Sequence, residues 1–171
     1  WILWYFNRPE MEARLRALCR AGRIISGPMY VSPDESLPGA ETHVRNFLLG
    51  LRQAAAWGPV LESGYVIDIF GHISQWPQIL RGFGIDNAIL MRGVNDDTCG
   101  AEFVWRAPDG SDVLAIRLSN TVSYSDFWYR VRRADEGRLL QLDAALDRLK
   151  ELIDWQRTRH STPELMLMDG V

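Results

Sequence analysis

The chain has 171 residues, 47% of them hydrophobic, and carries 19 basic against 22 acidic residues. A chain of this length and composition can bury one sizeable core, so we expect one globular domain over residues 1–171 and exclude intrinsic disorder. The near balance of charge, without a block of like charges, excludes an electrostatic basis for binding nucleic acid or an anionic membrane surface.

The N-terminal apolar run and the cysteines give no sign of export. Residues 1–6 are too few to cross a bilayer, and no basic segment or small-residue cleavage site accompanies them. Cys19 and Cys99 are too isolated for a disulfide framework, which fits a reducing compartment. We therefore expect a cytoplasmic protein. Because the chain begins without Met and ends just after an apolar run, we also expect an internal piece of a longer chain.

Helical periodicity marks the N-terminal part of the chain. In residues 9–22 apolar side chains recur at spacings of three and four, with Pro9 suited to the first turn and Gly22 to the C-cap. Residues 39–57 predict a second helix. Its expected buried face comprises Ala40, Val44, Phe47, Leu48, Leu51 and Ala55. Between the two helices, residues 29–31 predict a short buried strand.

Short apolar strands that end at polar residues come next. Residues 65–67 lead to Asp68, residues 88–91 lead to Arg92, and residues 165–168 predict a final strand. Such strands indicate a mostly parallel sheet covered by helices, as in a doubly wound fold or a β/α barrel. We expect the three strands to lie parallel in one sheet, with Asp68 and Arg92 on the same edge.

The remaining elements complete an α/β fold. The turn at residues 70–72 predicts a helix around residues 77–81, and residues 138–155 predict a long amphipathic helix. Two alternating stretches, 102–106 and 112–118, flank a Pro-Asp-Gly turn at residues 108–110. We therefore predict a β-hairpin appended to the alternating units.

Asp68 is the strongest candidate for chemistry. A carboxylate held rigidly where a strand ends can ligate a cation through one oxygen and attack an electrophilic carbon with the other. An aspartate at this position can equally cap the following turn. Position alone does not separate the two readings.

Several blocks, in order, carry a family resemblance. They are residues 22–35, 44–50, 64–72, 75–80, 81–86, 92–94, 102–105 and 108–111, and the most informative contains Ile67-Asp68-Ile69-Phe70-Gly71-His72. Together they resemble the glycoside hydrolase family 38 α-mannosidases of bacterial type. The resemblance implies that residues 1–171 are an incomplete catalytic domain, part of a β/α barrel with an inserted β-hairpin.

The resemblance also implies a retaining mechanism on an α-mannoside. Asp68 matches the family's nucleophile, which also ligates zinc. Arg92 matches an active-site arginine, where a guanidinium can hydrogen-bond the nucleophile or the sugar. The other interpretation of Arg92 is a surface salt bridge.

Other functional groups of the family do not occur in this sequence. The family's remaining zinc ligands are a His-X-Asp pair near the start of the domain and a distant downstream histidine, and no His-X-Asp is present here. The acid/base carboxylate is expected after the strand at 165–168, just beyond Val171, while Asp169 matches a non-catalytic turn position. We therefore expect the isolated chain to be inactive and to bind zinc weakly.

Alternative interpretations remain at this point. We favour structural roles for His72 and for the adjacent Asp34 and Glu35 in their loop. A metal-dependent carbohydrate deacetylase would need a His-X-X-X-His type of ligand set, which His43, His72 and His160 do not form. A non-catalytic carbohydrate-binding remnant is the third possibility.

Overall fold

The structure is a computed structural model that describes residues 8–95, 97–121, 123–132 and 141–170. At its centre lies a four-stranded sheet with the order β1-β2-β4-β3. The strands are β1 (Gly64–Val66), β2 (Asn87–Leu90), β3 (Glu102–Arg106) and β4 (Asp112–Arg117). β1, β2 and β4 run parallel, as expected, and β3 pairs antiparallel with β4. The fold is therefore mixed α/β with a mostly parallel sheet.

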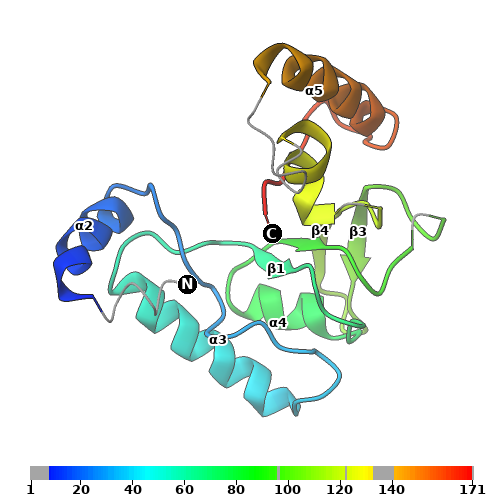
Figure 1. Ribbon diagram of the computed structural model, residues 1–171. Helices are drawn as coiled ribbons and strands as arrows, with labels where there is room; N and C mark the ends of the chain where they lie inside the picture. The colour runs from blue at the N-terminus through cyan, green and yellow to red at the C-terminus, as the bar shows by residue number, and fades with distance from the viewer. Residues whose placement is uncertain (1–7, 96, 122, 133–140, 171) are drawn as a thin grey trace.

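The described residues contain four α-helices. They are α2 (Pro9–Arg20), α3 (Ala40–Ala55), α4 (Trp76–Gly82) and α5 (Leu142–Arg157), with the short helical turns η1 (Ser123–Ser125) and η2 (Phe127–Arg132) before α5. Of these helices, α3 and α4 pack against the sheet. All four helices were predicted, three of them from apolar periodicity, although residues 138–140 of the last prediction lie outside the described residues. In Figure 1, α3 and α4 lie below the sheet and α5 above it. No helix among the described residues is long and apolar enough to span a bilayer.

The antiparallel pair belongs to the sheet. The two stretches predicted as a hairpin form β3 and β4, but β4 also pairs in parallel with β2 through the register Ile89↔Ile116. β4 is thus an interior strand and not an appendage. β3 alone is the added edge strand.

Both faces of the sheet bury apolar side chains. On the face toward α3 and α4, the buried cluster comprises Phe47, Val66, Ile69, Trp76, Leu80, Ile85, Ala88, Leu90, Val113 and Ala115. On the other face, Ile67, Met91 and Leu118 are buried, with Tyr65, Ile89, Tyr124, Met166 and Met168 packed around them. Two-sided burial explains why the strands have continuous apolar sequences.

The buried face of α3 differs from the prediction. Val44 and Leu48 are 36% and 54% exposed. Phe47 is buried as predicted, and the other buried residues are His43, Asn46, Gly50 and Ala54. The helix is rotated because two polar side chains bind the preceding loop. Hydrogen bonds compensate their burial, and apolar periodicity does not reveal such partners.

The predicted strand at residues 29–31 is wrong. Tyr30 and Val31 are 50% and 57% exposed, and no strand is assigned there. The Asn46 side chain makes the hydrogen bonds to this segment that a neighbouring strand would otherwise make. Its Oδ1 accepts from the Val31 N–H at 2.9 Å, and its Nδ2 donates to the Val31 carbonyl at 2.8 Å. A side-chain amide can satisfy both backbone groups in this way.

The predicted final strand at residues 165–168 is also wrong, so only two of the three strands expected to be parallel are present. The segment has no strand pairing in the described chain, but Met166 and Met168 still pack on the sheet. A bond from the Phe127 N–H to the Met168 carbonyl, 2.9 Å long, anchors its end. The apolar pattern correctly predicted that this segment packs against the core, but it wrongly predicted a strand.

Glu102 fixes the start of this C-terminal segment. Its carboxylate accepts hydrogen bonds from the Ser161 backbone N–H at 2.6 Å, the Thr162 hydroxyl at 2.7 Å and His160 Nδ1 at 2.8 Å. Burial by itself raises the pKa of Glu102, but these hydrogen bonds and one from the Ser161 hydroxyl outweigh it and lower the pKa from 4.5 to about 2.

This contact predicts a stability that depends on pH. Because the folded-state pKa of Glu102 is lowered, its contribution is complete above the unfolded value of 4.5 and is lost as pH falls toward about 2. Urea unfolding of the wild type and of Glu102→Gln should therefore show a stability difference that shrinks as the pH falls from 4.5 toward about 2. A difference that does not change with pH would contradict the role of the ionised carboxylate.

Gly50 provides a second prediction. A Cβ there would lie 2.3 Å from the Pro28 carbonyl oxygen and 2.4 Å from the Tyr30 nitrogen, whereas a Cβ at Gly82 would meet nothing within 4 Å. Gly50→Ala should cost about 1–3 kcal/mol of unfolding free energy. Gly82→Ala, the control in another helix, should be neutral or stabilising by up to about 1 kcal/mol. Equal effects in chemical denaturation would refute the close approach.

Candidate active site

Asp68 and Arg92 lie together at one edge of the sheet. Each follows the end of its parallel strand, and the register pairs Val66 with Leu90. The Arg92 N–H donates to the Ile67 carbonyl at 3.4 Å, and Arg92 Nε donates to Asp68 Oδ1. The prediction that both residues open on the same edge is confirmed.

The pair is accessible to a ligand. The side chains of Arg92 and Asp68 are 45% and 54% exposed. An ion pair this exposed contributes at most about 1 kcal/mol to stability. Its importance therefore lies in orientation, because Arg92 holds one carboxylate oxygen while the other can act on a ligand. The planar guanidinium has further N–H groups that can bind hydroxyl groups.

A cavity of about 280 Å³ adjoins Arg92. Its lining residues are Phe70, Met91, Arg92, Gly93, Asn95 and Asn120. The Phe70 side chain is 77% exposed, and the Arg92 guanidinium carbon lies 5.2 Å from its ring centre. An exposed ring beside hydrogen-bonding side chains offers both kinds of contact that a sugar ring can make.

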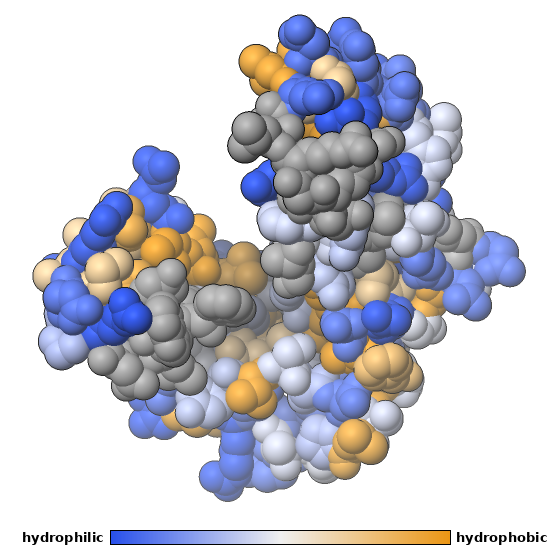
Figure 2. Space-filling view, in the orientation of Figure 1, coloured by the Kyte–Doolittle hydropathy of each residue, from blue (hydrophilic) through white to orange (hydrophobic). Residues whose placement is uncertain are grey.

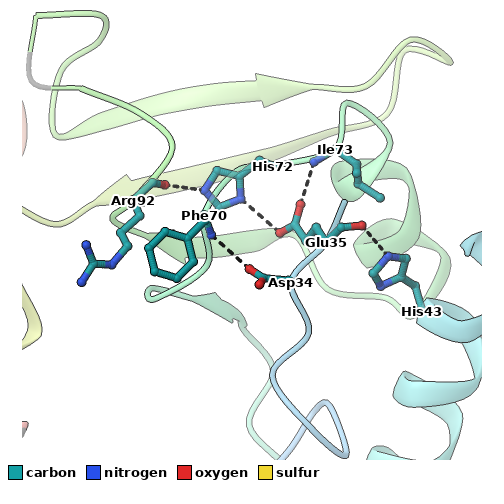
Figure 3. Close-up of polar contacts among 7 residues, drawn as sticks. All are labelled: Asp34, Glu35, His43, Phe70, His72, Ile73 and Arg92. Atoms are coloured by element: carbon teal, nitrogen blue, oxygen red, sulfur yellow. Dashed lines mark hydrogen bonds and ion pairs between the residues drawn. The ribbon is translucent and has the colours of Figure 1, made fainter. Parts of the chain in front are cut away.

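The buried carboxylate of Glu35 binds the loop that follows β1. Glu35 is 1% exposed; its Oε2 accepts from the Ile73 N–H at 2.8 Å, and its Oε1 lies 3.1 Å from His72 Nδ1. His72 Nε2 lies 2.8 Å from the Arg92 carbonyl oxygen. Figure 3 shows Glu35 between Ile73 and His72, with the Arg92 guanidinium directed away from the histidine.

The neighbouring residues have structural partners as well. Asp34 Oδ1 accepts from the Phe70 N–H at 3.2 Å, and His43 Nε2 lies 2.9 Å from the Glu35 carbonyl oxygen. Asp34 and Glu35 thus connect their loop to the one after β1, in line with the structural roles expected for them. The link from Glu35 through His72 to Arg92 was not predicted from the sequence. The only signal for it was that both blocks carry the family resemblance.

The described residues do not form a complete metal site. His43, His72 and His160 bind partners in the surrounding protein, and within the described ranges no group of three or more His, Cys, Asp or Glu residues could hold a metal ion. A closed zinc site takes about four ligands. Asp68 can supply one of them, so the side chains seen here do not fit a zinc ion by themselves.

Comparison with known proteins decides the family. The family model described as "Glycosyl hydrolases family 38 N-terminal domain" matches residues 1–171. The chain belongs to glycosyl hydrolase family 38. This assignment replaces the alternative interpretation as a carbohydrate deacetylase.

Individual relatives agree with the assignment. A protein of Halalkalibacterium halodurans, provisionally named mannosylglycerate hydrolase, is 36% identical over 97% of this chain and 19% of its own length. Alpha-mannosidase G of Dictyostelium discoideum is 32% identical over 63% of this chain and 10% of its own length. The crystal structure of an alpha-mannosidase from Enterococcus faecalis matches with a TM-score of 0.83 and 27% identity, covering 98% of this chain and 18% of that one. The family 38 chain thus spans between 10% and 19% of the length of these relatives.

Proposed function

We propose that the protein containing this chain is a retaining α-mannosidase in which Asp68 is the nucleophile and Arg92 binds the sugar. The observation that carries the proposal is the exposed Asp68 carboxylate, held by Arg92 at the carboxyl edge of a parallel sheet. Active groups in α/β folds lie at this edge. The family assignment supports the same chemistry.

The proposed reaction has two steps. An Asp68 oxygen attacks the anomeric carbon while a second carboxylic acid, outside this chain, protonates the departing glycosidic oxygen. The bond to the leaving group breaks and a glycosyl ester forms on Asp68. The second carboxylate then takes a proton from water, which attacks the same carbon and releases the sugar and Asp68. Arg92 orients the Asp68 carboxylate and offers N–H groups to the sugar hydroxyls.

The glycone of the substrate is an α-mannosyl group. The names of the relatives specify different substrates, mannosylglycerate for one and alpha-mannosides in general for another. These substrates share the mannosyl group, and the nucleophile and Arg92 act on that side of the scissile bond. An activated aryl α-mannoside therefore tests the chemistry without depending on the natural aglycone.

The sheet is proposed to be part of a β/α barrel. α3 and α4 cover one face, as barrel helices do. The opposite face presents Tyr65, Ile67, Ile89 and Met91. Bulky apolar side chains of this kind fill the interior of such barrels.

We further propose that Asp68 supplies one ligand to a zinc ion whose remaining ligands lie outside this chain. Zinc, when bound, would orient the sugar hydroxyls and stabilise charge. A cytoplasmic location is part of the proposal as well, supported by the absence of a disulfide between Cys19 and Cys99.

The substitution Asp68→Asn in the full-length enzyme tests the proposed nucleophile. The amide has nearly the same shape, so the fold should persist, but it cannot act as an anionic nucleophile. We expect turnover of an aryl α-mannoside to fall on the order of 10³-fold or more, with unchanged far-UV circular dichroism. If Asp68 only caps a turn, Asn serves as well. Activity within about tenfold of wild type, or 1.4 kcal/mol of barrier, would then return Asp68 to that role.

A further prediction concerns the isolated chain of residues 1–171. It should show no glycosidase activity and only weak zinc binding in calorimetry, because Asp68 provides at most two oxygens where about four ligands are needed. The full-length enzyme is the control and should bind zinc tightly. Tight stoichiometric binding by the isolated chain would show that the metal site has been misplaced. A full-length enzyme that is equally inactive would favour the non-catalytic remnant.

A further inference from the structure

We propose that His72 is a positioning residue for the nucleophile. Supported by Glu35, it fixes the backbone of Arg92 and thereby the guanidinium that orients Asp68. This inference rests on the proposed function of Asp68, and it assigns a role to two buried side chains that the reaction itself does not use.

The partners of the imidazole determine its orientation. The Arg92 carbonyl oxygen can only accept a hydrogen bond, so His72 Nε2, 2.8 Å away, must carry a proton and donate it. Nδ1 lies 3.1 Å from Glu35 Oε1. Both ring nitrogens are therefore engaged, and the histidine and glutamate side chains are only 7% and 0% exposed. Water cannot readily replace either bond, so a rotation of the ring would leave buried polar atoms unpaired.

Arg92 is consequently held on both sides of its backbone. Its N–H donates to the Ile67 carbonyl at 3.4 Å, and its own carbonyl accepts from His72. Ile67 immediately precedes Asp68, to which the Arg92 side chain donates. Together these contacts form a closed ring of bonds that joins the two strand ends. A small shift of the Arg92 backbone must therefore move the guanidinium relative to the carboxylate.

The residues around His72 pack closely against its ring. Gly93 has a positive φ of +81°, and a Cβ there would lie only 3.0 Å from His72 Cδ2. The Trp105 ring of β3 packs edge-on against the imidazole, with 5.2 Å between the two ring centres. The turn after Arg92 thus bends around the His72 ring. The ring in turn contacts both the loop that carries Glu35 and the edge strand.

The experiment compares His72→Gln with His72→Asn in the full-length enzyme. Glutamine extends an amide to about the position of Nε2 and can still donate to the Arg92 carbonyl, whereas asparagine reaches only about as far as Nδ1 and serves Glu35 alone. Two measurements report on the nucleophile. One is kcat and KM for an aryl α-mannoside, and the other is the rate at which a mannosyl fluoride that turns over slowly inactivates the enzyme. Mass spectrometry locates the covalent adduct.

We expect His72→Asn to lower kcat and the inactivation rate by about tenfold to a hundredfold, the scale of a misplacement near 1 Å, with KM little changed. His72→Gln should recover most of the loss. His160→Asn is the matched control, because His160 is 6% exposed and its Nδ1 lies 2.8 Å from Glu102. It should lower thermal stability in the same way but leave kcat within about threefold of wild type, since its network does not touch the nucleophile.

Several outcomes would overturn the inference. Equal activity in His72→Asn and His72→Gln, or equal loss in His72→Asn and His160→Asn, would reduce His72 to general stability. If His72→Asn does not fold, nitrogen-15 NMR of the histidine-labelled wild type decides, because an Nε2 without a proton is incompatible with donation to Arg92. An adduct on a residue other than Asp68 in the wild type would instead refute the proposed function.

Discussion

The parallel pairing of β1 with β2 is the constraint on which the site depends. Its register sets Val66 beside Leu90, so the residues two positions further along, Asp68 and Arg92, meet at the edge. A slip by one residue would turn each strand's side chains to the opposite face. It would expose the buried cluster and separate the carboxylate from the guanidinium. The hydrophobic register that stabilises the sheet therefore also assembles the candidate active site.

Buried polar side chains of α3 then place the loop that supports this edge. Asn46 binds both backbone groups of Val31, and His43 approaches the Glu35 carbonyl oxygen at 2.9 Å. Close contact of Gly50 with the backbone at residues 28–30 brings helix and loop together. Polar contacts are directional, so they hold an irregular loop in one conformation more strictly than apolar packing would. These contacts of α3 with the loop place the Glu35 carboxylate beside His72.

The sequence predicted the parts of the fold that depend on local pattern. The helices and the strand ends at Asp68 and Arg92 follow from apolar periodicity, and their common edge follows from parallel pairing. The face of α3 and the conformation at residues 29–31 could not be predicted, because both depend on hydrogen bonds between segments distant in sequence. At residues 165–168 the apolar run correctly indicates burial, but burial against a sheet does not require membership of it. The Glu35–His72 contact joins residues 37 positions apart, and composition or spacing cannot indicate such a contact.

The shape of the chain gives β1 a further significance. In the described residues β1 forms one border of the sheet, and Figure 2 shows the lobe with α2 and the lobe with α5 rising as separate arms from the central body. A border strand has unpaired N–H and C=O groups that can accept another strand. A parallel strand added there would run about 4.8 Å from β1. Its exit would then adjoin Asp68 on the side opposite Arg92, so Asp68 lies one strand's width from any group that an added strand contributes.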